Sequence, residues 1–255
     1  MGRITIGEVS LEVSVAGAGP PLLFLHPGEH FAQHQPFFDR LARDWRVIVP
    51  RHPGFGGSAR PDGFRTVHDL AYLYLDLIEA EGLDGVTLAG ASFGGWVALE
   101  IAVRSLARIA RLALIDAVGV KFGGREERDI ADIYALPFDE LQRRSFHDPA
   151  RAPDYRGLGE EEMLGIARDR EATALYGWRP YMHDPGLLRW LPRVRTPALV
   201  LWGEDDGIVA PQYGEALARA LPSARFERIA AAGHYPQIEH PDAVAEALLR
   251  FRAQR

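Results

Sequence analysis

Three residue types that together can form an acyl-transfer centre occur in this chain in the order serine, acid, histidine. Ser92 lies in a G-x-S-x-G stretch with Gly90 and Gly94, and His234 follows a run of small residues much later in the chain. A serine hydroxyl becomes a nucleophile when a base removes its proton, and the base needs a third group to orient it. The predicted chemistry is therefore attack by the Ser92 hydroxyl on an acyl carbon, with His234 as the base.

The acid that would orient His234 has three candidates. Asp206 ends an acidic turn that follows an apolar run, and Asp205 stands beside it. Asp116 follows a different apolar run. Open α/β sheets build their sites at the carboxyl ends of their strands, and the loops that carry Asp206 and His234 would open there.

Buried strands that alternate with helices are expected to position these residues. Apolar runs without alternation are typical of strands covered on both faces. Such runs recur at residues 22–25, 47–49, 86–89, 112–115 and 198–202, and a shorter strand is expected at 226–229. Helical patterns lie between them, and alternating residues at 4–15 favour an antiparallel hairpin at the start. The pattern predicts an α/β fold with a mostly parallel, doubly wound sheet.

The serine lies between one of these strands and a helix. The apolar run 86–89 precedes it, and residues 96–104 have the apolar and small side chains of a buried helix. A sharp strand-to-helix turn would hold Ser92 in a strained backbone conformation with its hydroxyl exposed. Gly90 and Gly94 have no Cβ, so neighbouring backbone could approach this turn closely.

The alternation stops between about residues 120 and 192. This stretch is rich in charged residues, Arg and Pro, and its short helical patterns at 129–136, 160–170 and 171–178 contain no buried-strand run. We therefore expect a core formed by residues 1–119 and 193–255, with a helical insertion at 120–192. Long insertions are often lids, although a helical decoration with no role in the site is the alternative.

Composition excludes several classes of function. The net charge of −6 argues against nucleic acid or an anionic membrane as the main partner. The absence of cysteine excludes disulfides, thiolate catalysis and cysteine metal sites. The first residues enter a strand pattern directly and lack the apolar segment of a signal peptide, and no apolar run approaches the length of a membrane span. We expect a cytoplasmic protein that acts on a small molecule, with its oligomeric state left open.

Together these segments resemble the α/β-hydrolase family, and the resemblance covers essentially the whole chain. The segments that carry it are the nucleophile elbow at 90–94, the G-x-x-D acid turn at 203–206, the histidine loop at 233–234, the oxyanion loop at 26–28, the P-G-x-G-x-S turn at 53–58 and an insertion at the position of the family's cap. The resemblance implies an α/β-hydrolase fold with a helical cap. It also favours Asp206 as the acid.

The chain departs from the family pattern in the oxyanion loop and in the P-G-x-G-x-S turn. The oxyanion loop usually begins His-Gly, but Pro27 follows the histidine here and has no N–H to donate. The resemblance then implies that the oxyanion donors are the Gly28 and Phe93 amides. The P-G-x-G-x-S turn is usually preceded by an aspartate at the position where this chain has Arg51, which reverses the local charge.

The resemblance implies a serine hydrolase that cleaves a small carboxylic ester or a similar acyl bond and needs no cofactor. The alternatives with the same three residues are hydrolysis of a carbon–carbon bond, as in the meta-cleavage-product hydrolases, and hydrolysis of a lactone. A non-catalytic ligand-binding or receptor protein on this fold is a further alternative, which would be expected to have a damaged triad.

We predict that Glu29, Trp178 and Tyr181 contact the substrate. Glu29 could equally be a surface carboxylate, and the two aromatic residues could form the core of the insertion. His30 and His34 have the spacing of a metal pair, but only Glu29 is near to complete a site, so no metal site is predicted. We expect these two histidines to line the pocket entrance or to be solvated.

Overall fold

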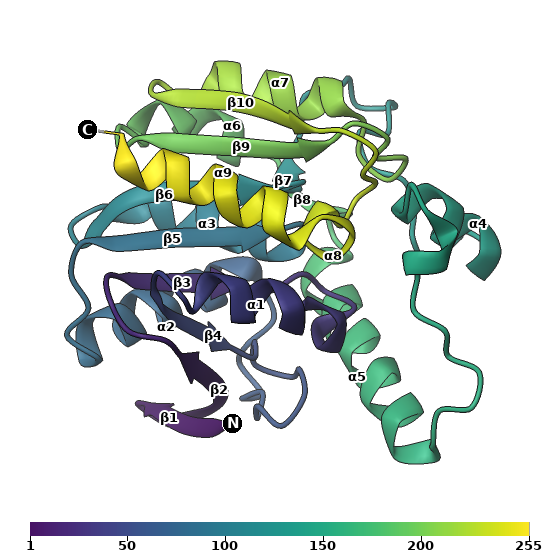
Figure 1. Ribbon diagram of the computed structural model, residues 1–255, viewed down its shortest axis with the longest axis horizontal. Coiled ribbons are helices and arrows are strands. Elements are labelled where there is room, and N and C mark those ends of the chain that lie inside the picture. Colours follow the sequence, from purple (N-terminus) through teal and green to yellow (C-terminus); the bar gives the residue numbers. More distant parts are fainter. Residues whose placement is uncertain (255) are drawn as a thin grey trace.

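A computed structural model, which describes residues 1–254, contains one eight-stranded sheet with helices on both faces (Figure 1). The strand order is β1-β2-β4-β3-β5-β6-β9-β10, with antiparallel pairing at β1–β2 and β2–β4 and parallel pairing elsewhere. The strands are β1 (Gly2–Ile6), β2 (Val9–Ala16), β3 (Pro21–Leu25), β4 (Arg46–Pro50), β5 (Val86–Ala91), β6 (Ile109–Ile115), β9 (Ala198–Gly203) and β10 (Ala224–Ile229). The predicted fold class is confirmed.

The central strand β3 shows why continuous apolar runs form this sheet. Leu23 and Leu25 pack into one hydrophobic core, and Leu22 and Phe24 pack into the other. Successive side chains of a strand point to opposite faces, so a strand covered on both faces must be apolar at every position. The same requirement explains the other apolar runs.

Two groups of helices provide the two cores. Helices α1 (Gln35–Leu41) and α9 (Pro241–Ala253) cover one face, and α2 (Val67–Ala80), α3 (Phe93–Arg104) and α7 (Pro211–Ala220) cover the other. The start of α2 is fixed by a capping box, because the Thr66 side chain accepts the Asp69 N–H and the Asp69 carboxylate accepts the Thr66 N–H. This capping pair is recognisable in the sequence.

Much of the segment between β6 and β9, including α4 (Phe138–Ser145) and α5 (Glu160–Gly177), lies off the end of the sheet at which the parallel strands finish (Figure 1). The segment also contains α6 (Leu187–Trp190) and a small parallel pair, β7 (Gly119–Val120) with β8 (His183–Asp184). The two short helical patterns at 160–178 form the single helix α5. Within the described residues, no helix is long and apolar enough to cross a membrane.

The helix expected at 129–136 is wrong, because this stretch forms turns. The Asp132 carboxylate accepts the N–H groups of Tyr134 and Ala135, which gives the backbone an alternative to helical hydrogen bonds. Pro137 then disfavours a helical conformation at Leu136. The helix begins only afterwards, as α4.

Candidate active site

Ser92 occupies a strained turn between β5 and α3. Its φ of 48° and ψ of −116° lie in a region that costs a non-glycine residue about 1–3 kcal/mol. The Ser92 N–H donates to Ile115 O at 2.9 Å, which fixes the turn against β6. A Cβ on Gly94 would lie 2.0 Å from Leu25 O, so glycine is required for the turn to approach β3. The sharp turn expected from the sequence is present.

The Ser92 hydroxyl begins a chain of hydrogen bonds that ends at a buried carboxylate. His234 Nε2 lies 2.8 Å from Ser92 Oγ, and His234 Nδ1 lies 2.8 Å from Asp206 Oδ2. A carboxylate only accepts, so Nδ1 carries the proton and Nε2 is free to accept the serine proton. Asp206 Oδ1 accepts the N–H groups of Ile208 and Val209, which orient the carboxylate.

The other two candidate acids have different partners. Asp205 Oδ2 lies 2.8 Å from His147 Nδ1 on the surface. Asp116 is fully buried and accepts the Gly203 N–H. Burial, together with the neighbouring Asp206 charge, raises the pKa of Asp116 well above its usual range. Of the three acids, only Asp206 is hydrogen-bonded to His234.

The loop that carries His234 is held by Glu239, a buried acid that the sequence analysis missed. Its carboxylate accepts the N–H groups of Gly233 at 2.6 Å and Asp148 at 2.9 Å. The His234 N–H itself donates to Ser145 O at 2.8 Å, at the end of α4. The backbone around His234 is therefore fixed partly by the segment between β6 and β9.

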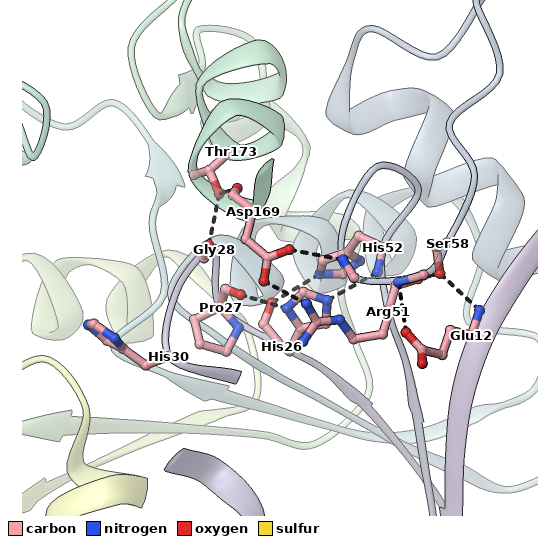
Figure 2. A network of polar contacts seen from close by, with 12 residues as sticks. Glu12, His26, Pro27, Gly28, His30, Arg51, His52, Ser58, Asp169 and Thr173 are labelled. Carbon is pink, nitrogen blue, oxygen red and sulfur yellow. Dashed lines mark hydrogen bonds and ion pairs between the residues drawn. The ribbon is translucent and has the colours of Figure 1, made fainter. Parts of the chain in front are cut away.

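The orientation of the Gly28 amide is set by buried histidines behind it (Figure 2). His26 Nε2 accepts a hydrogen bond from the backbone N–H of His52, so the proton of the His26 ring is on Nδ1. This Nδ1–H donates a hydrogen bond to Pro27 O at 2.6 Å. In a trans peptide the N–H points opposite to the carbonyl, so this bond directs the Gly28 N–H the other way. Gly28, Phe93 and Ser92 line one pocket. Within residues 1–254, neither the Gly28 nor the Phe93 N–H donates a hydrogen bond to the protein.

The remaining histidines of this region are buried and neutral. His52 bonds to Tyr74 Oη and His26 O, and burial lowers its pKa to about 3. Burial lowers the pKa of His30 to about 3 and that of His34 to about 4, so the expectation of solvated side chains is wrong. Both ring nitrogens of His34 are used, by His30 O and the Gln237 side chain, which leaves none for a metal ion.

A second group of side chains that could hold a metal ion comprises His68, Glu100 and Asp184. Their ligand atoms lie within 4.8 Å of one another. The Glu100 carboxylate already accepts from Trp96 Nε1 and Arg104, so the group is accounted for by bonds within the protein.

The pocket at Ser92 is small and mostly apolar. It has a volume of about 20 Å³, close to the space that one water molecule needs. Glu29 and Tyr181 both line it, together with Val118, Ile130, Ile133, Met182 and Ile208. Trp178 does not: it is 56% exposed and lines a neighbouring cavity of about 260 Å³, which shares Ile130 and Tyr181 with the pocket.

Helix α5 attaches to the loops around this pocket through polar side chains (Figure 2). The Thr173 hydroxyl donates to Gly28 O at 3.0 Å, and Arg170 forms an ion pair with Glu29. Burial raises the pKa of Glu29, although the Arg170 charge opposes that rise. Arg51, at the position that departs from the family pattern, forms an ion pair with Asp169 at 2.5 Å. The reversed charge on the loop is thus matched by an acid on α5.

Comparisons with known proteins agree with this architecture. Residues 17–247 match the sequence model of a family described as the Alpha/beta hydrolase family. A 2-hydroxymuconate semialdehyde hydrolase from Pseudomonas sp. (strain CF600) is 30% identical, with 94% of this chain and 89% of that protein covered. Esterase YbfF from Escherichia coli (strain K12) is 31% identical, with coverage of 83% and 84%. The solved structure of a thermophilic esterase from Thermogutta terrifontis is similar, with a TM-score of 0.76, 26% identity and coverage of 99% and 98%.

Proposed function

The chain belongs to the alpha/beta hydrolase family and is a hydrolase, and we propose that it cleaves a small carboxylic ester or a similar acyl bond through an acyl-enzyme on Ser92. The observation that carries this proposal is the unbroken chain from Ser92 Oγ through His234 to Asp206, with both distances at 2.8 Å. The esterases among the similar proteins support an ester as the substrate.

In the proposed reaction, His234 Nε2 removes the Ser92 proton as Oγ attacks the carbonyl carbon. Asp206 holds the imidazole in the required tautomer and stabilises the imidazolium that forms. The Gly28 and Phe93 N–H groups donate to the developing oxyanion, and His234 then gives its proton to the leaving group. A water molecule activated by His234 releases the acid and frees Ser92.

We further propose that residues 120–192 form a cap over a core of residues 1–119 and 193–255. The contact from Thr173 to Gly28 and the contact from Ser145 O to the His234 N–H support this division, because both tie the insertion to proposed catalytic loops. The pocket at Ser92 is too small for an ester, so parts of its wall must move when substrate enters. The cavity beyond Tyr181 and a second one of about 300 Å³ beyond Glu29 could take the two ends of the substrate.

Hydrolysis of a carbon–carbon bond is the second candidate. The similarity to the 2-hydroxymuconate semialdehyde hydrolase over most of both chains favours it. The Glu29–Arg170 pair places a cation beside the pocket, and this cation could bind an acidic substrate. Turnover of p-nitrophenyl acetate and of vinylogous diketone acids should be compared, and a strong preference for the diketones would favour this candidate over ester cleavage.

Two variants with matched controls test the assignment of the residues. Ser92→Ala should abolish the acyl-enzyme burst with p-nitrophenyl acetate and lower kcat by more than about 10⁴-fold. Asp206→Asn should lower kcat by about 10³- to 10⁴-fold, while Asp205→Asn, which changes a carboxylate facing His147, should have little effect. Full activity of Ser92→Ala would contradict serine catalysis, and equal losses at the two aspartates would contradict the assignment of Asp206.

A further inference from the structure

Asp116 is a second buried carboxyl group behind the Ser92–His234–Asp206 chain. It follows directly after β6 and is 0% exposed. One of its oxygens, one Asp206 oxygen and one His234 ring nitrogen all lie within 4.8 Å of one another. Its backbone φ of 45° lies in the left-handed region, which aspartate adopts more readily than most other non-glycine residues. The fold thus places a second buried acid, Asp116, next to the proposed catalytic acid.

The hydrogen bonds of the two carboxyl groups differ. Asp206 accepts three donors, which are two backbone N–H groups on Oδ1 and the His234 imidazole on Oδ2. Asp116 Oδ1 accepts the Gly203 N–H, whereas Asp116 Oδ2 is buried and accepts from no donor among the described residues. A buried oxygen without a donor is costly if it is charged, but it can carry a proton and become a donor itself. The negative charge therefore belongs on Asp206 and the proton on Asp116.

We propose that Asp116 is a proton-bearing positioning residue that donates from its Oδ2–H to Asp206 and supplies the negative charge itself when Asp206 is removed. This inference rests on the proposed function, because it concerns the acid of the same site. The donated hydrogen bond holds the Asp206 carboxylate toward His234. In Asp206→Asn, the new amide can donate to Asp116, which then ionises near the imidazole.

The charges around Asp116 agree with this assignment. The groups that face it are Asp206, His234 and Glu239, with the Gly203 N–H as its backbone donor. Burial and the Asp206 and Glu239 charges raise the pKa of Asp116, and the Gly203 N–H only partly opposes them. Two close carboxyl groups in a dry site share one proton, because both cannot ionise.

An infrared measurement tests where the proton lies. Protein labelled with ¹³C-aspartate should show at pH 7.5 the C=O stretch of an un-ionised carboxylic acid, and Asp116→Asn should lose that band. The label distinguishes this band from any signal of Glu29. The measurement does not depend on turnover, so it stands even if Ser92→Ala shows that the proposed function is wrong. Absence of the band in the wild-type protein overturns the proposal.

Kinetics test what Asp116 does for His234. Asp116→Asn keeps a donor toward Asp206 and an acceptor for Gly203, so it should retain at least about tenfold more activity than Asp116→Leu, which keeps neither. The Asp206→Asn/Asp116→Asn double variant should be at least about tenfold slower than Asp206→Asn, since it removes the last carboxylate near the imidazole. The residual activity of Asp206→Asn should rise with pH as Asp116 ionises.

If Asp116 had only a structural role, the kinetic results would be different. In that case the double variant would be no slower than Asp206→Asn, and the residual activity would show no added dependence on pH. Either result overturns the proposal. If Asp116→Leu fails to fold, the comparison of the double variant with Asp206→Asn decides alone, because both contain only near-isosteric changes.

Discussion

Replacing Gly28 by alanine tests the assignment of the Gly28 N–H as an oxyanion donor. A Cβ at this position would lie 2.5 Å from Thr173 Oγ1 and 2.6 Å from Thr173 Cγ2, nearly 1 Å closer than ordinary contact at 3.4 Å. Thr173 is buried, and its hydroxyl is held at both Gly28 O and Asp169 O. The Gly28 backbone is not left-handed, so alanine is acceptable there except for this collision.

The collision sets the size of the expected effect. Because Thr173 cannot turn away without losing its hydrogen bonds, the overlap must be relieved by moving the Gly28 loop or α5 by several tenths of an ångström. An oxyanion donor must lie within about 2.7–3.1 Å of the developing charge, and loss of one donor lowers kcat by about 10²- to 10³-fold. We expect Gly28→Ala to lower kcat by about 100-fold, with a smaller change in KM.

The assay is steady-state hydrolysis of p-nitrophenyl acetate, with thermal unfolding to show that the variants are folded. Gly63→Ala is the matched control, because a Cβ there meets nothing within 4 Å. The Gly28→Ala/Thr173→Ala double variant removes the two closest atoms and leaves Thr173 Cβ, at 3.1 Å, as the nearest atom. The kcat of this double variant should be at least about tenfold higher than that of Gly28→Ala. A folded Gly28→Ala variant with unchanged kcat, or a double variant that recovers nothing, would refute the reasoning.

Two further predictions concern stability. Between pH 7.5 and 5.5 the free energy of unfolding should fall by about 1.4 kcal/mol for each buried neutral histidine, because the unfolded chain gains protons below pH 6.5 that the folded protein does not bind. The histidines whose pKa burial lowers are His26, His30, His34 and His52. Urea unfolding at the two pH values checks this, and equal stability would contradict it. Asp169→Asn should destabilise the protein by about 2–3 kcal/mol, because it leaves Arg51 largely buried without its partner, whereas Asp154→Asn, which changes an exposed pair with Arg156, should leave the urea midpoint unchanged.

The core of the fold could be predicted because its determinants are local in the sequence. Continuous apolar runs correspond to strands buried on both faces, and the Thr66–Asp69 pair marks a helix start. The approach of Ser92 and His234 could also be predicted, because parallel strands bring their carboxyl ends together at one edge. The residues alone left Asp206, Asp205 and Asp116 open, and the family resemblance favoured Asp206. The coordinates show Asp206 bonded to His234 and Asp205 bonded to His147, because adjacent residues of a turn point in different directions.

The packing of α5 was harder to predict because several of its contacts with the loops around the pocket are polar. The buried face of α5 includes Ala172, Thr173 and Tyr176, and Asp169 lies one turn earlier on the same side. A helix face that contains an acid and a threonine has the composition of a solvent-exposed surface, so hydrophobic periodicity does not identify it. The Asp169 carboxylate pairs with Arg51, a residue 118 positions away, and also accepts the Gly56 N–H. The Thr173 hydroxyl donates to the carbonyl of a loop glycine. The polar contacts that make the buried face of α5 hard to recognise in the sequence therefore also join the wall of the pocket to the proposed oxyanion loop.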